Sequence, residues 1–129
     1  MKVAIIAANG GAFDAYKVFN IATAAAAADG EVEIFFTFEG LNLIHKEAHK
    51  QLPMPEGTEH FKEGFEKANV PSIPELIEMA QDLGVKFVAC QMTMDVMGLS
   101  KEDFVDGIEV GGAATFLNYA KDADISLTF

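Results

Sequence analysis

The chain has 129 residues, of which half are hydrophobic and 22% are charged, so we expect one globular domain over 1–129 rather than a disordered segment. Nine lysines and no arginine stand against 20 acidic residues, which gives a net charge of −11. Nucleic acids and anionic membranes are bound mainly by clustered basic side chains, so this composition argues against both as partners.

No signal peptide or membrane-spanning segment is expected. Residues 1–6 lead directly into a strand-like run, and the apolar runs are shorter than the about 20 residues that span a bilayer. Cys90 is the only cysteine, so an intrachain disulfide is excluded. We therefore expect a location in the reducing cytoplasm.

The first half of the chain predicts two strands and three helices. Residues 2–8 form an apolar run typical of a buried strand, and residues 31–38 are rich in β-favouring side chains. Helices are expected over 12–29, 41–50 and 58–68, with a proline-rich loop at 51–57. The whole segment 40–70 is long for a plain connection, so we expect it to serve function or oligomer contacts.

The second half continues the alternation of helices and strands. The capping box Ser72-Ile73-Pro74-Glu75 starts a helix that Gly84 ends, and a second capping box spans 100–103. A short helix is expected at 92–97, and strands are predicted at 85–89, 108–110 and 124–129. Between the last two strands a helix is expected to face inward with Ala113, Phe116, Leu117 and Ala120.

Strands that alternate with helices predict a parallel sheet covered on both faces, which is a three-layer αβα fold with about five mainly parallel strands. For five strands we expect the flavodoxin-like order 2-1-3-4-5. In that order the first strand lies beside the strand that ends at Cys90, and a crevice opens between the carboxyl ends of these two strands.

Cys90 stands where a buried strand turns into a helix, at the end of the sheet where α/β proteins collect ligands and reactive groups. The free N–H groups and the dipole of a following helix lower the pKa of such a thiol. We therefore single out Cys90 as a nucleophile or as the carrier of a persulfide. The alternative is that Cys90 is a small buried hydrophobic residue.

The predicted crevice would bring five further residues to the thiol as substrate-binding residues: Asn9, Gly10, Gly11, Gln91 and Met92. The turn at 9–11 could cradle an anion at a helix amino terminus, or it could be a tight turn that needs glycine. It lacks the full glycine pattern of nucleotide-binding loops, so we expect no cofactor.

No metal site is expected around the thiol. Cys90 together with Met92, Met94 and Met97 offers soft sulfur ligands that suit Cu(I). Methionines at alternating positions of a short helix point to different sides, however, and methionine is more often an adaptable apolar contact.

The histidines also give no complete metal site. His45 and His49 share a face of the predicted helix, but two histidines are half a zinc site, and His60 lies across the proline loop. A solvated or oligomer-facing pair is the simpler explanation. Among the carboxylates, Glu39 is the least ordinary because it follows a run of buried aromatic residues at the carboxyl end of a strand.

Three segments of the chain resemble the DsrE/DsrF-like family of small sulfur-transfer proteins, in the branch often labelled peroxiredoxin-family. They are the opening strand with its alanine-rich helix, residues 33–43, and residues 89–98 continuing through 107–113. The resemblance implies a three-layer α/β fold, a homo-oligomer and a persulfide-carrying cysteine, which here is Cys90. This branch is expected to have an aromatic residue where Glu39 stands. Peroxide chemistry is disfavoured because a peroxidatic cysteine usually has an arginine nearby.

We therefore expect a sulfur carrier or sulfurtransferase that relays sulfane sulfur as a Cys90 persulfide between thiol partners, either small persulfides or donor and acceptor proteins. The alternative is a non-catalytic oligomeric module that binds a small ligand or a protein partner and in which Cys90 is structural. The sequence leaves open the donor, the acceptor and whether transfer turns over catalytically.

Overall fold

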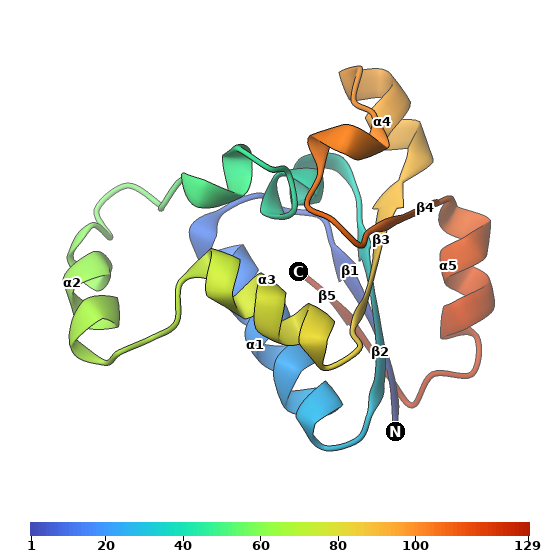
Figure 1. Cartoon of the computed structure of the whole chain (residues 1–129), viewed down its shortest axis with the longest axis horizontal. Helices are drawn as coiled ribbons and strands as arrows, with labels where there is room; N and C mark the ends of the chain where they lie inside the picture. The colour runs from blue at the N-terminus through green and yellow to red at the C-terminus, as the bar shows by residue number, and fades with distance from the viewer.

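The computed structural model describes all residues, 1–129 (Figure 1). The elements, in chain order, are β1 (Lys2–Ala7), α1 (Ala12–Ala27), β2 (Glu31–Phe36), the 3-10 helices η1 (Phe38–Leu43) and η2 (Ala48–Lys50), α2 (His60–Lys67), α3 (Ile73–Asp82), β3 (Lys86–Cys90), α4 (Gln91–Met97), the 3-10 helix η3 (Lys101–Asp103), β4 (Glu109–Gly111), α5 (Ala113–Ala120) and β5 (Ile125–Thr128).

The five strands are parallel and lie in the order β4-β3-β2-β1-β5. The predicted α/β fold with a five-stranded parallel sheet is confirmed, whereas the flavodoxin-like order 2-1-3-4-5 is wrong. The chain winds in one direction from β1 to β4 and crosses back only for β5, so β2 lies between β1 and β3. Residues 32–36 of β2 are all buried, which is typical of a central strand and could have indicated this order.

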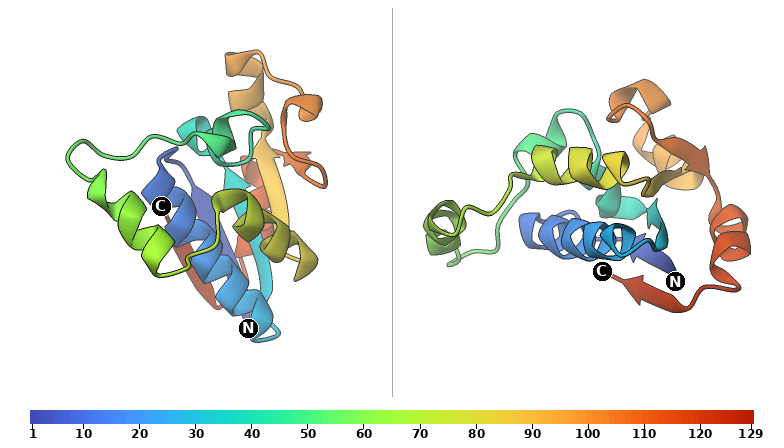
Figure 2. Two further views of the ribbon diagram at one scale, coloured as in Figure 1. Left: turned by 60° about the vertical axis from the view of Figure 1, so that its left-hand side comes forward. Right: turned by 60° about the horizontal axis from the view of Figure 1, so that its bottom comes forward.

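The larger core lies on the face of the sheet that α1 and α3 cover (Figures 1 and 2). Phe19 of α1 packs between Phe36 of β2 and Phe87 of β3, with ring centroids 6.2 and 5.7 Å away. Burying each such phenylalanine stabilises the fold by roughly 1.5–3 kcal/mol. Ala15 and Ala22 of α1 are completely buried, because small side chains let this helix approach its neighbours closely.

The opposite face of the sheet carries a smaller cluster under α5 (Figure 1). The crossover from β4 to β5 runs against the direction of the earlier ones, so a right-handed connection places α5 on this side. Phe116 stacks on Phe35 of β2 at 5.3 Å, and Tyr119 and Ala120 continue its stripe. The predicted inward positions of Ala113 and Leu117 are wrong, since both side chains are exposed.

Residues 38–50 form two 3-10 helices instead of the α-helix predicted over 41–50. Leu41, Leu43 and Ile44 are all completely buried, and no single face of an α-helix provides that spacing. A Cβ atom on Gly40 would overlap the carbonyl group of Ala7, so glycine lets η1 touch the end of β1. This part of the long connection therefore belongs to the core.

The helix α2 stands away from the sheet (Figure 2) and has no buried residue. Phe61 and Phe65, one turn apart as predicted, lie 5.2 and 6.3 Å from the ring of Phe13 on α1, and Phe65 also lies 4.6 Å from Tyr16. Aromatic contacts along one edge thus attach α2 to the rest of the molecule.

Candidate functional site around Cys90

Cys90 is the last residue of β3, at the point where the strand passes into α4. Its side chain is 5% exposed and lies on the α5 side of the sheet, in a cluster with Phe35, Val88 and Phe116. The predicted position at the carboxyl end of a buried strand is confirmed. The thiol is therefore held in a packed apolar setting just below the surface from which α4 projects (Figure 1).

Four hydrogen-bond donors surround the thiol. Burial raises the pKa of Cys90 and is the largest single influence on it. The hydroxyl and backbone N–H of Thr93, the hydroxyl of Thr37 and the backbone N–H of Met92 together outweigh burial, so the pKa of the thiol is lowered below its usual value. The thiolate is the nucleophilic form of cysteine, so a lowered pKa favours reactivity.

Thr37 and Thr93 come to the thiol from two neighbouring elements. Thr37 follows β2, Thr93 lies in the first turn of α4, and their hydroxyl oxygens are 3.3 Å apart. Thr93 also accepts a hydrogen bond of 3.2 Å from the backbone N–H of Phe38. The sequence analysis missed both threonines, although adjacent β2 and β3 would have brought the residue after β2 to Cys90.

Phe38 has an unusual backbone conformation, with φ at +50°. L-residues with a bulky side chain rarely adopt this left-handed region, which costs roughly 1–2 kcal/mol per residue. The turn aims the N–H of Phe38 at Thr93 and leaves the aromatic ring 61% exposed. Strain of this kind is concentrated at functional sites, where surrounding contacts hold it in place.

Exposed apolar side chains surround the mouth of the site. We call them the collar: Phe38, Met92, Val96 and Met97. With Thr93 and Glu39 they line a hollow of about 170 Å³ between η1 and α4. Exposed apolar groups gathered in one place mark contact surfaces more often than scattered ones do.

The residues of the predicted crevice separate into two groups. Gln91 and Met92 begin α4 directly beside Cys90, and the amide of Gln91 donates to the Asp95 carboxylate at 2.8 Å. Asn9, Gly10 and Gly11 follow β1, which β2 separates from β3, so a shared crevice with Cys90 is wrong.

The glycine turn after β1 is explained by close packing and by hydrogen bonds within the chain. A Cβ on Gly10 would lie 2.5 Å from the carbonyl oxygen of Glu39, so glycine is needed for close packing against η1. The N–H of Gly11 donates to the carboxylate of Asp14, and the N–H of Ala12 donates to the carbonyl of Pro53. These donors already have acceptors within the chain and offer no cradle for an anion.

The histidines do not converge. His45 Nδ1 accepts backbone N–H groups of Glu47 and Ala48, whereas His49 Nδ1 donates to the carbonyl of His45. His60 begins α2. The chain contains no group of three or more His, Cys, Asp or Glu residues arranged to hold a metal ion. No helix combines the length and the apolar character needed to cross a membrane.

The fold and the site together define a small α/β protein whose distinctive chemistry is one thiol, its pKa lowered by neighbouring hydrogen-bond donors, at the end of an inner strand of a parallel sheet. The model of the DsrE/DsrF/DrsH-like family matches residues 1–61 and 53–128. The chain therefore belongs to this family, as its sequence resemblance predicts.

Individual relatives agree with this assignment. The chain is 37% identical over 153 residues to sulfur carrier protein DsrE2 of Allochromatium vinosum, covering 98% of this chain and 96% of that protein. It is 34% identical over 154 residues to the uncharacterized protein YrkE of Bacillus subtilis, covering 98% and 95%. The crystal structure of YchN from E. coli superposes with a TM-score of 0.67 at 22% identity, over 100% of this chain and 99% of that one, which shows a shared fold.

Both alignments are longer than the 129 residues of this chain, so each relative has residues without a counterpart here. The two matches to the family model meet at residues 53–61, which lead from the proline loop into α2.

Proposed function

We propose that the chain carries sulfane sulfur as a persulfide on Cys90. The observation that carries this proposal is that the chain's only cysteine lies among four hydrogen-bond donors that lower the pKa of its thiol. The name of the 37% identical relative, a sulfur carrier protein, supports the same role. A chain with one cysteine cannot discharge a persulfide by forming an internal disulfide, so the sulfur must leave to another thiol.

Neither the loading of sulfur onto Cys90 nor its transfer to an acceptor requires an oxidant. The Cys90 thiolate attacks the outer sulfur of a donor persulfide, a new S–S bond forms at Cys90, and the donor leaves as a thiolate. An acceptor thiolate then attacks the outer sulfur of the Cys90 persulfide, and the Cys90 thiolate leaves. The donors from Thr37, Thr93 and Met92 stabilise the negative sulfur in both steps.

Access to the thiol is the second requirement. Cys90 is 5% exposed, so a partner thiol has to approach past Phe38 and Met92, two exposed side chains of the collar that are free to change rotamer. The apolar surroundings of Cys90 also slow the loss of its outer sulfur to small thiols dissolved in water. We propose protein or small persulfide donors and acceptors, a homo-oligomeric state and a reducing compartment, as the single cysteine and the resemblance indicate.

The test is the intact mass of the purified chain after brief exposure to inorganic polysulfide, measured with and without reductant. We expect a gain of one or more sulfur atoms that reductant reverses. Cys90→Ser keeps the size of the side chain and should remain unmodified while its circular dichroism and melting temperature match the parent chain.

The rival function is a binding module in which Cys90 only fills space. Under that reading a folded chain gains no sulfur, and its thiol stays unreactive towards alkylating reagents until it is denatured. A Cys90→Ser variant that fails to fold would also favour the structural role over the carrier.

A further inference from the structure

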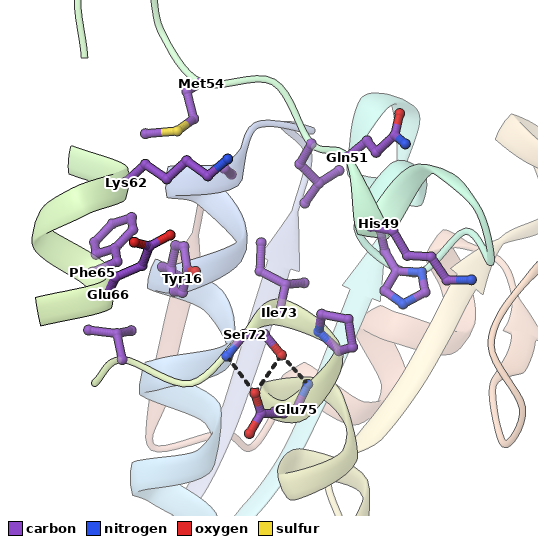
Figure 3. Close-up of a pocket in the computed structure, with 15 residues that line it drawn as sticks. Tyr16, His49, Gln51, Met54, Lys62, Phe65, Glu66, Ser72, Ile73 and Glu75 are labelled. Atoms are coloured by element: carbon purple, nitrogen blue, oxygen red, sulfur yellow. Dashed lines mark hydrogen bonds between the residues drawn. The ribbon is translucent and has the colours of Figure 1, made fainter. Parts of the chain in front are cut away.

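Cys90 faces the side of the sheet that α5 covers (Figure 1). It lies in one buried cluster with Phe116 of α5 and with Phe35 and Val88 of the sheet. A cleft of about 600 Å³ that includes His49 lies on the opposite side, between α1, α2 and α3 (Figure 3). Cys90 does not line that cleft, so the cleft gives no access to the thiol. Apart from the collar, α5 is therefore the element that closes the site.

Few contacts hold α5 on the sheet. Phe116 is its one buried residue, and the neighbouring Leu117 is 63% exposed. The hydroxyl of Tyr119 donates to the carbonyl of Val3 at 3.4 Å, which is long for two oxygen atoms. Gly112 directly precedes the helix, and glycine restrains the backbone least. Elements with so little buried apolar surface open at a lower free energy than the core does.

A carboxyl group without a hydrogen-bond partner lies beneath α5. Glu33 of β2 points to the same side of the sheet as Phe35, two residues later, and is 4% exposed. Its Oε2 is the only buried side-chain nitrogen or oxygen that lacks a partner. A carboxylate in this position is stabilised when water reaches it, so it favours a movement that uncovers it.

The charged and titratable groups around Glu33 come from all the elements packed against it and from the turn after α5: Lys2, Glu31, Lys86, Glu109, Tyr119 and Asp122. Lys86 lies 3.8 Å from Glu109. Lys2 lies 2.6 Å from Asp122, so both lysines have their ion-pair partners elsewhere. Burial is the largest influence on the pKa of Glu33 and raises it, so this carboxyl ionises at a higher pH than an exposed one.

We propose that α5 is a hinged cover over Cys90 and that ionisation of Glu33 beneath it favours the open position. In the closed position the thiol is shielded on this side, and in the open position water reaches the Glu33 carboxylate. Opening should become more frequent as the pH rises through the pKa of Glu33, because only the charged form gains from hydration. The use of this opening by a sulfur donor or acceptor rests on the proposed function, whereas the opening itself does not.

The test compares Glu33→Gln with the parent chain at neutral pH. Two rates are measured on the folded protein: hydrogen exchange of the α5 amides and alkylation of Cys90 by iodoacetamide. We expect the variant to slow both roughly fivefold, because the amide keeps the shape of the side chain and has no charge to hydrate. Removing a negative charge would by itself favour the thiolate and speed alkylation, so slower alkylation reports reduced access.

Two further variants make the test specific. Glu31→Gln removes the same charge from an exposed position on the same face of β2, and it should leave both rates nearly unchanged. Phe116→Leu should speed both, because it weakens the stacking on Phe35. In the parent chain the α5 amides should exchange faster than those of α1 and independently of low urea, which distinguishes the opening of one helix from global unfolding.

The proposal is overturned if Glu33→Gln and the parent chain show equal rates at neutral pH, or if Glu31→Gln slows them as much. Sulfur loading from polysulfide is measured on the same samples. Rates that depend on Glu33 without sulfur loading would refute the carrier function and support the cover, and loading with rates that ignore Glu33 would do the reverse.

Discussion

The hydroxyl of Thr93 connects the thiol to the strained turn at Phe38, because it helps to lower the pKa of Cys90 and accepts a hydrogen bond from the N–H of Phe38. Removing this hydroxyl should therefore lower the reactivity of Cys90 while the fold stays the same. Thr93→Val keeps the β-branched outline of this buried residue, and Thr93→Ser keeps the hydroxyl.

We expect Thr93→Val to raise the pKa of Cys90. A hydrogen bond worth about 1 kcal/mol corresponds to a thiolate population about fivefold smaller at neutral pH. The measurement is the rate of iodoacetamide alkylation against pH, in which the Thr93→Val profile should move to higher pH. Thr93→Ser should restore the profile of the parent chain, and a Thr93→Val profile identical to that of the parent would contradict the assigned hydrogen bond.

Phe38 allows a second prediction at the residue scale. Glycine is normally less stabilising than alanine, but at a φ of +50° the order should reverse because glycine tolerates the left-handed region. We expect Phe38→Gly to be more stable than Phe38→Ala by about 1 kcal/mol in urea unfolding. Equal stability, or greater stability of the alanine variant, would mean that the turn at Phe38 is not strained.

At the scale of elements, the contact between α5 and the sheet contains a buried carboxyl group. Glu33 of β2 is 4% exposed, and its Oε2 is the one buried side-chain oxygen or nitrogen without a hydrogen-bond partner. Burial raises the pKa of Glu33; Lys86 opposes this and Glu109 adds to it. Because the pKa is raised in the folded state, its contribution to stability is complete at low pH and is lost as the pH rises through the raised pKa.

We therefore expect Glu33→Gln to increase the free energy of unfolding at neutral pH by about 1 kcal/mol. The gain should shrink as the pH is lowered through the raised pKa of Glu33, because both side chains are then neutral. Urea unfolding at a series of pH values measures this difference. A gain that does not depend on pH would show that burial of charge is not its cause.

At the scale of the whole molecule, the collar favours association between copies of the chain, and the net charge opposes it. The collar offers apolar surface for association, with Val96 80% exposed, whereas a charge of −11 makes copies of the chain repel one another. Salt screens charge repulsion over about 8 Å at physiological ionic strength but leaves apolar contacts in place.

The proposed homo-oligomer should therefore become more stable as salt is added. Size-exclusion chromatography with light scattering at low and high salt measures this, with Val96→Lys as the variant that breaks the apolar surface. Val96→Lys should shift the chain towards a smaller species. A monomer at every salt concentration would contradict the assembly, and an oligomer that Val96→Lys leaves intact would place its interface elsewhere.

The local sequence determined the elements of this protein. Apolar runs and β-favouring residues located all five strands, the capping boxes located the starts of α3 and η3, and the single cysteine identified the thiol. These features depend on neighbours along the chain, and periodicity and capping report such neighbours directly.

Only the tertiary structure decided which elements lie side by side. The position of β2 between β1 and β3 brought Thr37 and Phe38 to Cys90 and removed the Asn9 turn from it. The same packing turned 41–50 into 3-10 helices and opened the cleft at His49. Strand order follows from how the crossovers pack on the two faces of the sheet, and that packing is a long-range property that a local pattern does not contain.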